Sequence, residues 1–172
     1  MQNKLRLEDI EITPVSNILE MMEIRKIRNS LRAFLTNDTR EISILRQLFF
    51  YARYLISPRD HITIYSVKLF GEVIGYGLIN QGPEGWRQTR LITGCIHEKF
   101  HGMGIGERLF RFLIKQIDRK KHRVCLDVLA TNTNAVRLYE KLGFVKFNQR
   151  EFISYYRLPY GKDLHHRTSL HQ

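Results

Sequence analysis

The chain divides into stretches in which hydrophobic and polar residues follow one of two periods, and these periods predict its strands and helices. Residues 5–15 alternate as an edge strand does, and Pro14 ends that stretch. Two helical patterns follow, within residues 16–35 and 42–55, and Ser57-Pro58 closes the second. Their apolar positions are Ile18, Leu19, Met22, Ile24 and Ile27, then Ile42, Leu45, Leu48, Phe49, Ala52 and Leu55.

The second half of the chain begins with extended segments and then mixes both periods. Residues 61–70 and 73–79 alternate around a Gly71-Glu72 turn, which predicts an antiparallel hairpin, and a third extended stretch covers 86–96. Residues 104–121 are helical in pattern, and a strand at 123–130 follows. A short helix between Asn132 and Gly143 precedes two strands at 144–147 and 153–158. This order predicts an α/β (α+β) fold, a mixed sheet flanked by helices.

Length and composition indicate one globular unit. The 172 residues fit a single domain, which we expect over 1–160, with a flexible tail at 161–172. Hydrophobic residues make up 43% and charged residues 26%, as in an ordinary globular protein. The sequence has no apolar run long enough for a membrane span, and its first residues are too charged for a secretion signal. A cytoplasmic protein without a membrane partner is therefore expected.

Cysteine usage and charge narrow the chemistry further. Cys95 and Cys125 form no CxxC pair or Cys/His cluster, so neither a disulfide framework nor a metal site is expected. The net charge of +11 suits an anionic partner, whether nucleic acid, a membrane surface or a phosphate-rich small molecule. Residues 99–123 hold eight of the basic residues and two acidic ones. Much of the excess positive charge therefore lies beside one glycine-rich loop.

That loop, residues 100–106, reads Phe-His-Gly-Met-Gly-Ile-Gly and lies between an extended stretch and a helical one. Glycines allow a tight turn and a close approach of the backbone to a ligand, and the start of a helix offers unpaired N–H groups. The pattern is typical of an anion site, although a tight turn without a ligand has the same composition. A Walker loop is excluded because Glu107 and Arg108 follow Gly106 in place of Lys-Ser/Thr. A dinucleotide fingerprint does not fit either, because Leu109 stands where a third small residue is required.

Two motifs at fixed spacing resemble the GCN5-related N-acetyltransferase (GNAT) superfamily. The first runs from Ile96 to Gly106, and the second is Asn132-x-x-Ala135-x-x-Leu138-Tyr139-Glu-Lys-Leu-Gly143-Phe144. The resemblance covers residues 90–147 specifically, and the preceding order of elements is also similar. It implies a mixed, mostly antiparallel sheet of six or seven strands with about four helices. The sheet is expected to be splayed between the strands that end at Ile96 and Ala130.

The resemblance also implies where acetyl-CoA, the cosubstrate, is held. The backbone N–H groups of the glycine loop would bind its pyrophosphate, main-chain groups near Ile96 would pair with the pantetheine and the thioester carbonyl, and Asn132 would face the pantetheine arm. An ordinary helix N-cap is an equal interpretation of Asn132. The loop residues implied in cofactor binding are His101, Gly102, Met103, Gly104, Ile105 and Gly106. His101 departs from the Gln or Arg usual at its position.

The chemical step implied by the resemblance is direct attack of a primary amine on the acetyl group in a ternary complex. Tyr139 would act on the departing thiolate, although periodicity alone would make it a core aromatic residue. No Asp or Glu occurs between Trp86 and Ile96, where some family members place a catalytic base. His97 and Glu98 are candidates for that base, and each is equally well a solvated loop residue.

The acceptor is expected to be a small-molecule amine. Basic residues of the first two helices would suit a phosphate or carboxylate, so a nucleotide-linked amino sugar or an amino acid derivative is the leading hypothesis. They are Arg25, Arg28, Arg32 and Arg40, together with Asn29. A protein N-terminus or lysine is the alternative acceptor, and a homodimer stays open. A nucleic-acid-binding module without catalysis is the competing class, but the basic row between 108 and 119 lacks interleaved aromatic residues on its polar face.

Overall fold

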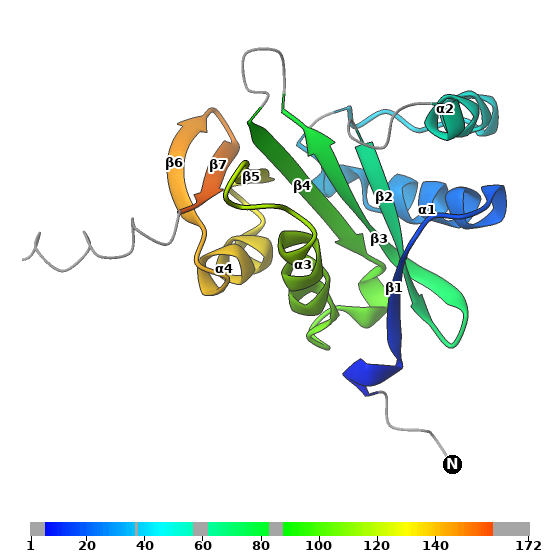
Figure 1. Cartoon of the computed structure of the whole chain (residues 1–172), viewed down its shortest axis with the longest axis horizontal. Coiled ribbons are helices and arrows are strands. Elements are labelled where there is room, and N and C mark those ends of the chain that lie inside the picture. Colours follow the sequence, from blue (N-terminus) through cyan, green and yellow to red (C-terminus); the bar gives the residue numbers. More distant parts are fainter. Residues whose placement is uncertain (1–5, 37, 57–61, 83–87, 160–172) are drawn as a thin grey trace, which may run out of the picture.

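The computed structural model describes residues 6–36, 38–56, 62–82 and 88–159. Seven strands form one sheet in the order β1-β2-β3-β4-β5-β7-β6, and four α-helices cover it (Figure 1). The strands are β1 (Ile10–Pro14), β2 (Ile62–Leu69), β3 (Glu72–Gln81), β4 (Thr89–Ile96), β5 (Arg123–Leu129), β6 (Val145–Arg150) and β7 (Ile153–Leu158). The helices are α1 (Ile18–Ser30), α2 (Ile44–Ile56), α3 (Ile105–Lys115) and α4 (Thr133–Lys141). The predicted fold class is confirmed, whereas Trp86 and the tail at 161–172 lie outside the described residues.

The sheet is antiparallel except at the junction of β4 and β5. These two strands pair in parallel from Thr89↔Arg123 to Leu91↔Cys125 and no further along the described chain. Beyond Leu91, β4 continues to Ile96 while β5 pairs on its other side with β7. The strands therefore diverge, as predicted, and leave a seam between the second halves of β4 and β5.

Two apolar cores lie on opposite faces of the sheet. The larger core packs α3 and α4 against the sheet and includes Leu109, Phe110, Leu126 and Tyr139. The smaller core packs α1 against β2 and β3 through residues such as Met21, Ile24 and Tyr76. In Figure 1, α1 and α2 lie to one side of the central strands, and α3 and α4 to the other. No helix of the described chain has the length and apolarity needed to cross a bilayer.

Helix α3 approaches the sheet closely because two strand residues lack side chains. A Cβ atom at Gly94 would come within 2.9 Å of Leu109, and one at Gly77 would also come within 2.9 Å of that leucine. The glycines thus let the apolar face of α3 rest on β3 and β4. The helix ends at Lys115 rather than at residue 121 as predicted, yet Ile117 is still buried. The amphipathic period therefore continues past the last helical hydrogen bonds.

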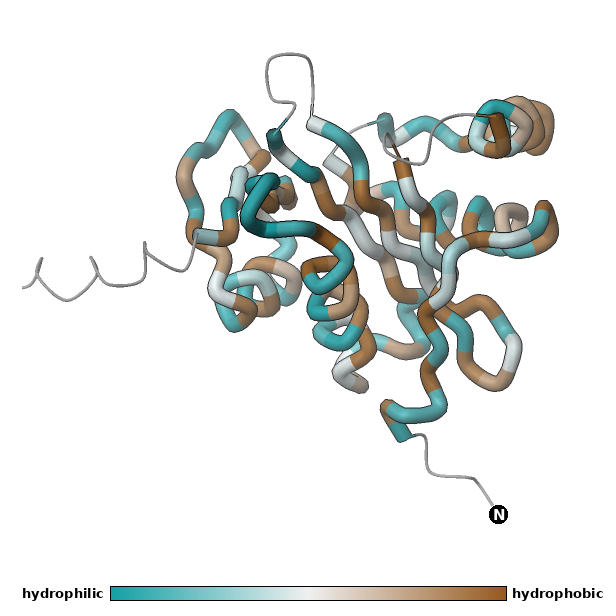
Figure 2. The backbone as a smooth tube through the Cα atoms, viewed as in Figure 1, coloured by the Kyte–Doolittle hydropathy of each residue, from teal (hydrophilic) through white to brown (hydrophobic). Residues whose placement is uncertain are grey.

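Helix α2 has the opposite orientation from the one its pattern predicts. Leu45, Phe49 and Ile56 are 68%, 74% and 84% exposed, whereas Gln47 is only 4% exposed. Figure 2 shows this helix largely in the colour of hydrophobic residues at the edge of the molecule. The predicted apolar face at 42–55 therefore does not face the core. Periodicity identifies a helix with an apolar stripe, but the tertiary contacts decide which side turns inward.

Candidate active site

The glycine-rich loop forms a short irregular bridge from β4 to α3. A 3-10 turn covers Glu98–Phe100, and Gly102 and Gly104 then adopt φ values of +77° and +78°. These left-handed conformations are accessible to glycine at little energetic cost. Within the described residues, the backbone N–H groups of 102–107 donate no hydrogen bond to the chain, and the first helical bond is Arg108 N to Gly104 O at 3.1 Å. The loop therefore presents a row of free N–H groups at the positive end of the α3 dipole.

His101 differs from the loop residues after it, because both its backbone N–H and its ring are hydrogen-bonded to the chain. Its backbone N–H donates to the carbonyl of Glu98 at 3.0 Å, so it is not free to bind an anion. Its ring Nε2 lies 2.7 Å from the Ile96 carbonyl oxygen, which ties the loop back to the end of β4. The row of free N–H groups therefore begins at Gly102, one residue later than the sequence predicts.

The end of β4 exposes backbone groups to the seam. The N–H of His97 donates to Ile74 O at 2.8 Å, so this pair is a hydrogen-bonded pair of the antiparallel ladder. Alternation along such a ladder turns the backbone groups of Gly94 and Ile96 away from β3, toward β5. The β4–β5 pairing stops at Leu91, so these groups border the seam. The Ile96 carbonyl accepts from His101, while its N–H remains available among the described residues.

Tyr139 lies in the larger core beside this seam. Its ring packs edge-on against Phe110, with centroids 4.9 Å apart, and contacts Phe144 at 6.1 Å. Burial raises the pKa of the Tyr139 hydroxyl, and the charges of Cys95 and Asp127 raise it further. Cys95 belongs to β4 and Asp127 to β5, so the hydroxyl is influenced by groups on both sides of the seam. A phenol in this environment stays protonated at neutral pH and can act as a hydrogen-bond donor.

Asn132, His97 and Asp127 also border this region. Asn132 caps α4 by accepting a hydrogen bond from the N–H of Ala135 at 3.2 Å, which agrees with its interpretation as an N-cap. His97 Nδ1 accepts from the N–H of Lys99 at 3.3 Å, and its ring lies edge-on to Phe100. Asp127 lies on β5 and belongs to neither of the two sequence motifs. Its charge helps to raise the pKa of the Tyr139 hydroxyl, after burial and Cys95, and the sequence motifs gave no signal for it.

A second part of the site is a cavity of about 360 Å³ on the opposite face of the sheet. Its wall is built from α1, α2, the connection between them, and strands β2 to β4. Tyr76 and Thr93 form part of the wall, and Tyr76 lies opposite Cys95 in the β3–β4 ladder. Thr93 and Cys95 belong to the second half of β4, which borders the seam, so the cavity lies against a strand that also borders the seam. Its size suits a small organic molecule.

Most of the polar residues that the sequence assigns to the acceptor are engaged with the chain itself. Arg28 donates to the carbonyls of Asp38 and Arg40, and Arg40 pairs with Asp38 at 2.7 Å. Asn29 binds both the carbonyl and the N–H of Ile42, each at 3.0 Å. Arg32 lies 3.8 Å from Glu41. These side chains fix the α1–α2 connection. Among the five, only Arg25 keeps an unpaired buried group in the described structure, its Nε.

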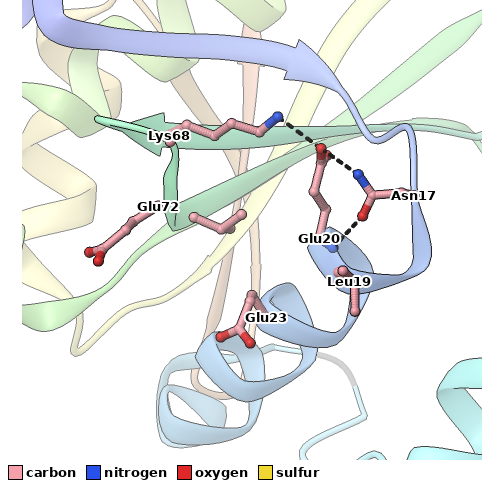
Figure 3. A pocket seen from close by; sticks show the side chains of 8 residues that line it. Asn17, Leu19, Glu20, Glu23, Lys68 and Glu72 are labelled. Atoms are coloured by element: carbon pink, nitrogen blue, oxygen red, sulfur yellow. Dashed lines mark hydrogen bonds and ion pairs between the residues drawn. The ribbon is translucent and has the colours of Figure 1, made fainter.

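A further hollow, of about 500 Å³, lies at the start of α1 beside the β2–β3 turn (Figure 3). Its central carboxylate, Glu20, accepts from Lys68 at 2.8 Å and from Ser66 at 3.0 Å. Asn17 adds a side-chain bond to Glu20 and caps α1 through the Glu20 N–H. Burial raises the pKa of Glu20, but the hydrogen bonds from Lys68 and Ser66 lower it by more, so the net pKa is below its ordinary value. The polar groups here satisfy one another, which indicates an anchor for α1 rather than a ligand site.

Comparison with known sequences then decides the family. A family model described as the acetyltransferase (GNAT) family matches residues 24–144. The chain belongs to the GNAT acetyltransferase family. It is 32% identical over 85 residues to the spermine/spermidine N(1)-acetyltransferase of Bacillus subtilis, a match covering 45% of this chain and 55% of the relative. It is 27% identical over 101 residues to an N-alpha-acetyltransferase of Sulfurisphaera tokodaii, covering 49% and 60%. The chain thus spans little more than half the length of these curated relatives.

Solved GNAT structures share the fold over most of the chain. One is yncA of Salmonella typhimurium, solved with its cofactor acetyl-CoA, with a TM-score of 0.71 and 21% identity; the match covers 87% of this chain and 93% of that one. Another is AAC(6')-Ib in complex with ribostamycin and coenzyme A, with a TM-score of 0.72 and 18% identity, covering 93% and 98%. At these identities the likeness establishes the fold of this GNAT chain.

Proposed function

We propose that this GNAT chain transfers the acetyl group of acetyl-CoA to a primary amine of a small molecule. The observation that carries the proposal is the row of free N–H groups at residues 102–107, at the start of α3. Such a row, reinforced by the helix dipole, binds phosphate oxygens, and coenzyme A carries a diphosphate. The open space around Gly102, where a Cβ atom would meet nothing within 4 Å, leaves room for that group.

The other proposed contacts to the cosubstrate lie along the seam between β4 and β5. When bound, acetyl-CoA supplies the activated acetyl group. Residues 102–107 would hold its diphosphate, the backbone of Gly94 and Ile96 would pair with its pantetheine arm, and Asn132 would face that arm from the start of α4. The His101 side chain would act indirectly, because it holds the Ile96 carbonyl.

Tyr139 would assist departure of the thiolate. Its hydroxyl is protonated at neutral pH because burial raises its pKa, so it can donate a hydrogen bond to the leaving sulfur. Full proton transfer is unfavourable, since a thiol has a reference pKa of about 8.5 and even an unperturbed phenol one of about 10. Stabilisation of the thiolate by a hydrogen bond is therefore its proposed role.

The attacking amine has to lose a proton before or during the reaction. An alkyl amine with a pKa near 10 is almost entirely protonated at pH 7. His97, at the end of β4, and Asp127, across the seam on β5, are the proposed groups for accepting or relaying this proton. Passage of the amine from water into the cavity next to Tyr76 and Thr93 would also favour its neutral form.

The acceptor class we propose is a nucleotide-linked amino sugar or an amino acid derivative, bound in the cavity between α1 and α2. Three arginines and one aspartate line that cavity, Arg25, Arg28, Arg46 and Asp38, which favours an amine that also bears an acid group. Transfer to a protein N-terminus is the second candidate, and the similarity to an N-alpha-acetyltransferase favours it. A peptide panel beside the small-molecule panel separates the two acceptors.

Calorimetric titration with acetyl-CoA tests the core of the proposal. We expect saturable binding to the unmodified chain and at least a hundredfold weaker binding to Gly104→Trp, since the new side chain would occupy the loop. Gly71→Trp is the matched control, because Gly71 also has a positive φ, of +86°, but lies in the β2–β3 turn. Salt-sensitive binding of oligonucleotides without binding of acetyl-CoA would overturn the assignment.

A further inference from the structure

Two side chains in the cavity between α1 and α2 carry hydrogen-bonding groups that the described chain does not use. Gln47 is 4% exposed and lines this cavity, and its side-chain amide makes no hydrogen bond with another described residue, although it does not belong to the fully buried unpaired atoms. Arg25 donates through Nη1 to the Ile42 carbonyl at 2.8 Å, while its Nε is buried and has no partner there. Buried donors are paired in the great majority of cases. The unpaired Nε of Arg25, with the Gln47 amide beside it on the same cavity, indicates that a ligand completes these groups.

The position of Gln47 is itself informative. It is the buried residue of α2, although most of the helix is apolar and several of its large apolar side chains face solvent. The leucines and isoleucines of α2 do not cover the smaller core; Tyr51 and Tyr54 pack against it, on the same side of the helix as Gln47. Arg25, Arg28 and Asn29 bond to backbone groups of the α1–α2 connection, which holds the helix in this orientation. Large apolar side chains of α2 are therefore exposed to solvent, while the amide group of Gln47 lies at the cavity.

The charges around the cavity define what these groups would bind. Arg40 and Arg46 hold the pKa of Asp38 well below its ordinary value by hydrogen bonds, so its negative charge is present but compensated. The N–H groups of Arg28 are occupied by carbonyl oxygens, which leaves its positive charge without an anion. Arg25 is likewise bound only to a carbonyl. The cavity is therefore net positive, which disfavours a polycation and favours an anion.

We propose that Gln47 and Arg25 together bind an oxyanion group, a carboxylate or a phosphate, of the amine acceptor. This inference rests on the proposed function. The amide nitrogen of Gln47 and the Nε of Arg25 each donate to an oxygen of that group, and the guanidinium supplies the opposite charge. The amine end of the acceptor then extends toward Tyr76 and Thr93, on the side of the cavity nearest Cys95 and the seam. By this arrangement a polyamine such as spermidine is a poor substrate.

A panel of matched acceptors tests the proposal. Acetyl transfer is followed by release of free thiol from acetyl-CoA, using sets of three compounds that share one amine and differ at the other end: carboxylate, phosphate or methyl ester. Spermidine serves as the polycation. We expect kcat/KM at least tenfold higher for an acid-bearing member than for the ester. The better of the two acids identifies the oxyanion that is recognised.

Variants of Gln47 attribute this preference to the cavity. Gln47→Met keeps the shape and removes both polar atoms, so KM for the acid-bearing acceptor is expected to rise about tenfold with an unchanged dissociation constant for acetyl-CoA. Gln47→Glu places a negative charge opposite the anion and is expected to favour the ester over the acid. The change in preference distinguishes recognition from a loss of folding. Arg53→Met is the control, because Arg53 lies on the same helix, is exposed and is not among the residues lining the cavity.

Calorimetry with the acid lacking its amine provides a readout that does not depend on turnover. This compound is expected to bind the unmodified chain and to bind at least tenfold more weakly to Gln47→Met and Arg25→Met. Equal use of acid and ester, unchanged by these variants in a chain that binds acetyl-CoA, overturns the oxyanion site alone. A failure to bind acetyl-CoA overturns the proposed function instead.

Discussion

The two faces of the splayed sheet present polar groups of different kinds. On the face covered by α3 and α4, the available groups belong to the backbone: the N–H groups of residues 102–107 and the edge of β4 near Ile96. On the face covered by α1 and α2, they belong to side chains, Gln47 and Arg25. A backbone site depends on conformation and tolerates many side chains, whereas a side-chain site changes with each substitution. The proposed cofactor half would therefore tolerate changes of side chain, whereas the proposed acceptor half depends on particular side chains.

The largest effect is expected at Tyr139. Its side chain is proposed to take part in the reaction on the face where most of the other proposed contacts come from the backbone. Tyr139→Phe removes the proposed donor to the leaving sulfur and keeps the ring packed against Phe110. We expect kcat to fall by about a hundredfold, with the affinity for acetyl-CoA nearly unchanged. Steady-state kinetics and calorimetry measure the two quantities.

Tyr156→Phe is the matched control for this experiment. Tyr156 belongs to the same cluster, with ring centroids 6.5 Å from Tyr139, but its hydroxyl lies 3.4 Å from Glu140. Its loss should leave kcat within about twofold. Equal turnover of the Tyr139→Phe enzyme and the unmodified chain would remove Tyr139 from the mechanism.

The next effect concerns how α1 is anchored on the acceptor face. Lys68→Met deprives the Glu20 carboxylate of its cationic partner in an environment where the two side chains are 10% and 18% exposed. The free energy of unfolding is expected to fall by about 1–3 kcal/mol, as for other buried polar groups left unpaired. Urea denaturation measures it. Lys26→Met, which breaks an exposed pair with Glu23, should change it by less than about 1 kcal/mol.

A smaller effect is expected at the connection between α1 and α2. Asn29→Ala removes both hydrogen bonds to the backbone of Ile42 and loosens the wall that carries Arg25. We expect the KM of the acceptor to rise severalfold and the dissociation constant of acetyl-CoA to stay the same. Ser30→Ala is the control, because the Ser30 hydroxyl bonds only within α1, to Ile27 O. A parallel loss of cofactor affinity would contradict the separation of the two faces.

The smallest effect is the pH dependence of the Glu20 anchor. The pKa of Glu20 is lowered from 4.5 in the folded chain, so its carboxylate contributes stability above that value and loses it as the pH falls through the folded-state pKa. The melting temperature of the unmodified chain should exceed that of Glu20→Gln at pH 7, and the difference should shrink steadily below pH 4.5. Glu23→Gln, at the exposed pair with Lys26, serves as the control. A difference that stays constant down to pH 3 would show that the charge of Glu20 contributes no stability.

The contrast between the faces also explains what could be predicted from sequence. The loop at 100–106 could be located because positive φ at Gly102 and Gly104 requires a residue type that is visible in the sequence. The residues that bound α4 could also be predicted: Gly143 after its end has a positive φ, and the Asn132 side chain at its start accepts a hydrogen bond from a free backbone N–H group. Local backbone conformations of this kind require particular residue types, which can be recognised in a sequence. The proposed cofactor half consists mainly of such conformations.

The acceptor half could not be predicted in the same way. The pattern of α2 placed Leu45, Leu48 and Phe49 on a buried face, whereas contacts from Arg25 and Asn29, distant in sequence, turn Gln47 inward. The engagement of His101 by Glu98 and Ile96 was missed because a short 3-10 turn has little sequence signature. The only hint in the sequence was Gln47, a glutamine among the apolar residues of α2. Its importance becomes clear only from its burial in the structure.

The short parallel ladder between β4 and β5 has a consequence for cooperativity. Among the described residues, only 89–91 of β4 are paired with β5. Beyond Leu91 the two parts of the sheet are joined through the helices that cover them, as where Phe110 of α3 packs on Tyr139 of α4. A molecule that inserts amide groups into the seam would form hydrogen bonds with both β4 and β5. The two parts of the sheet would then be stabilised together. Slowed hydrogen exchange on both sides at once, extending to β7, would be the signature of that coupling.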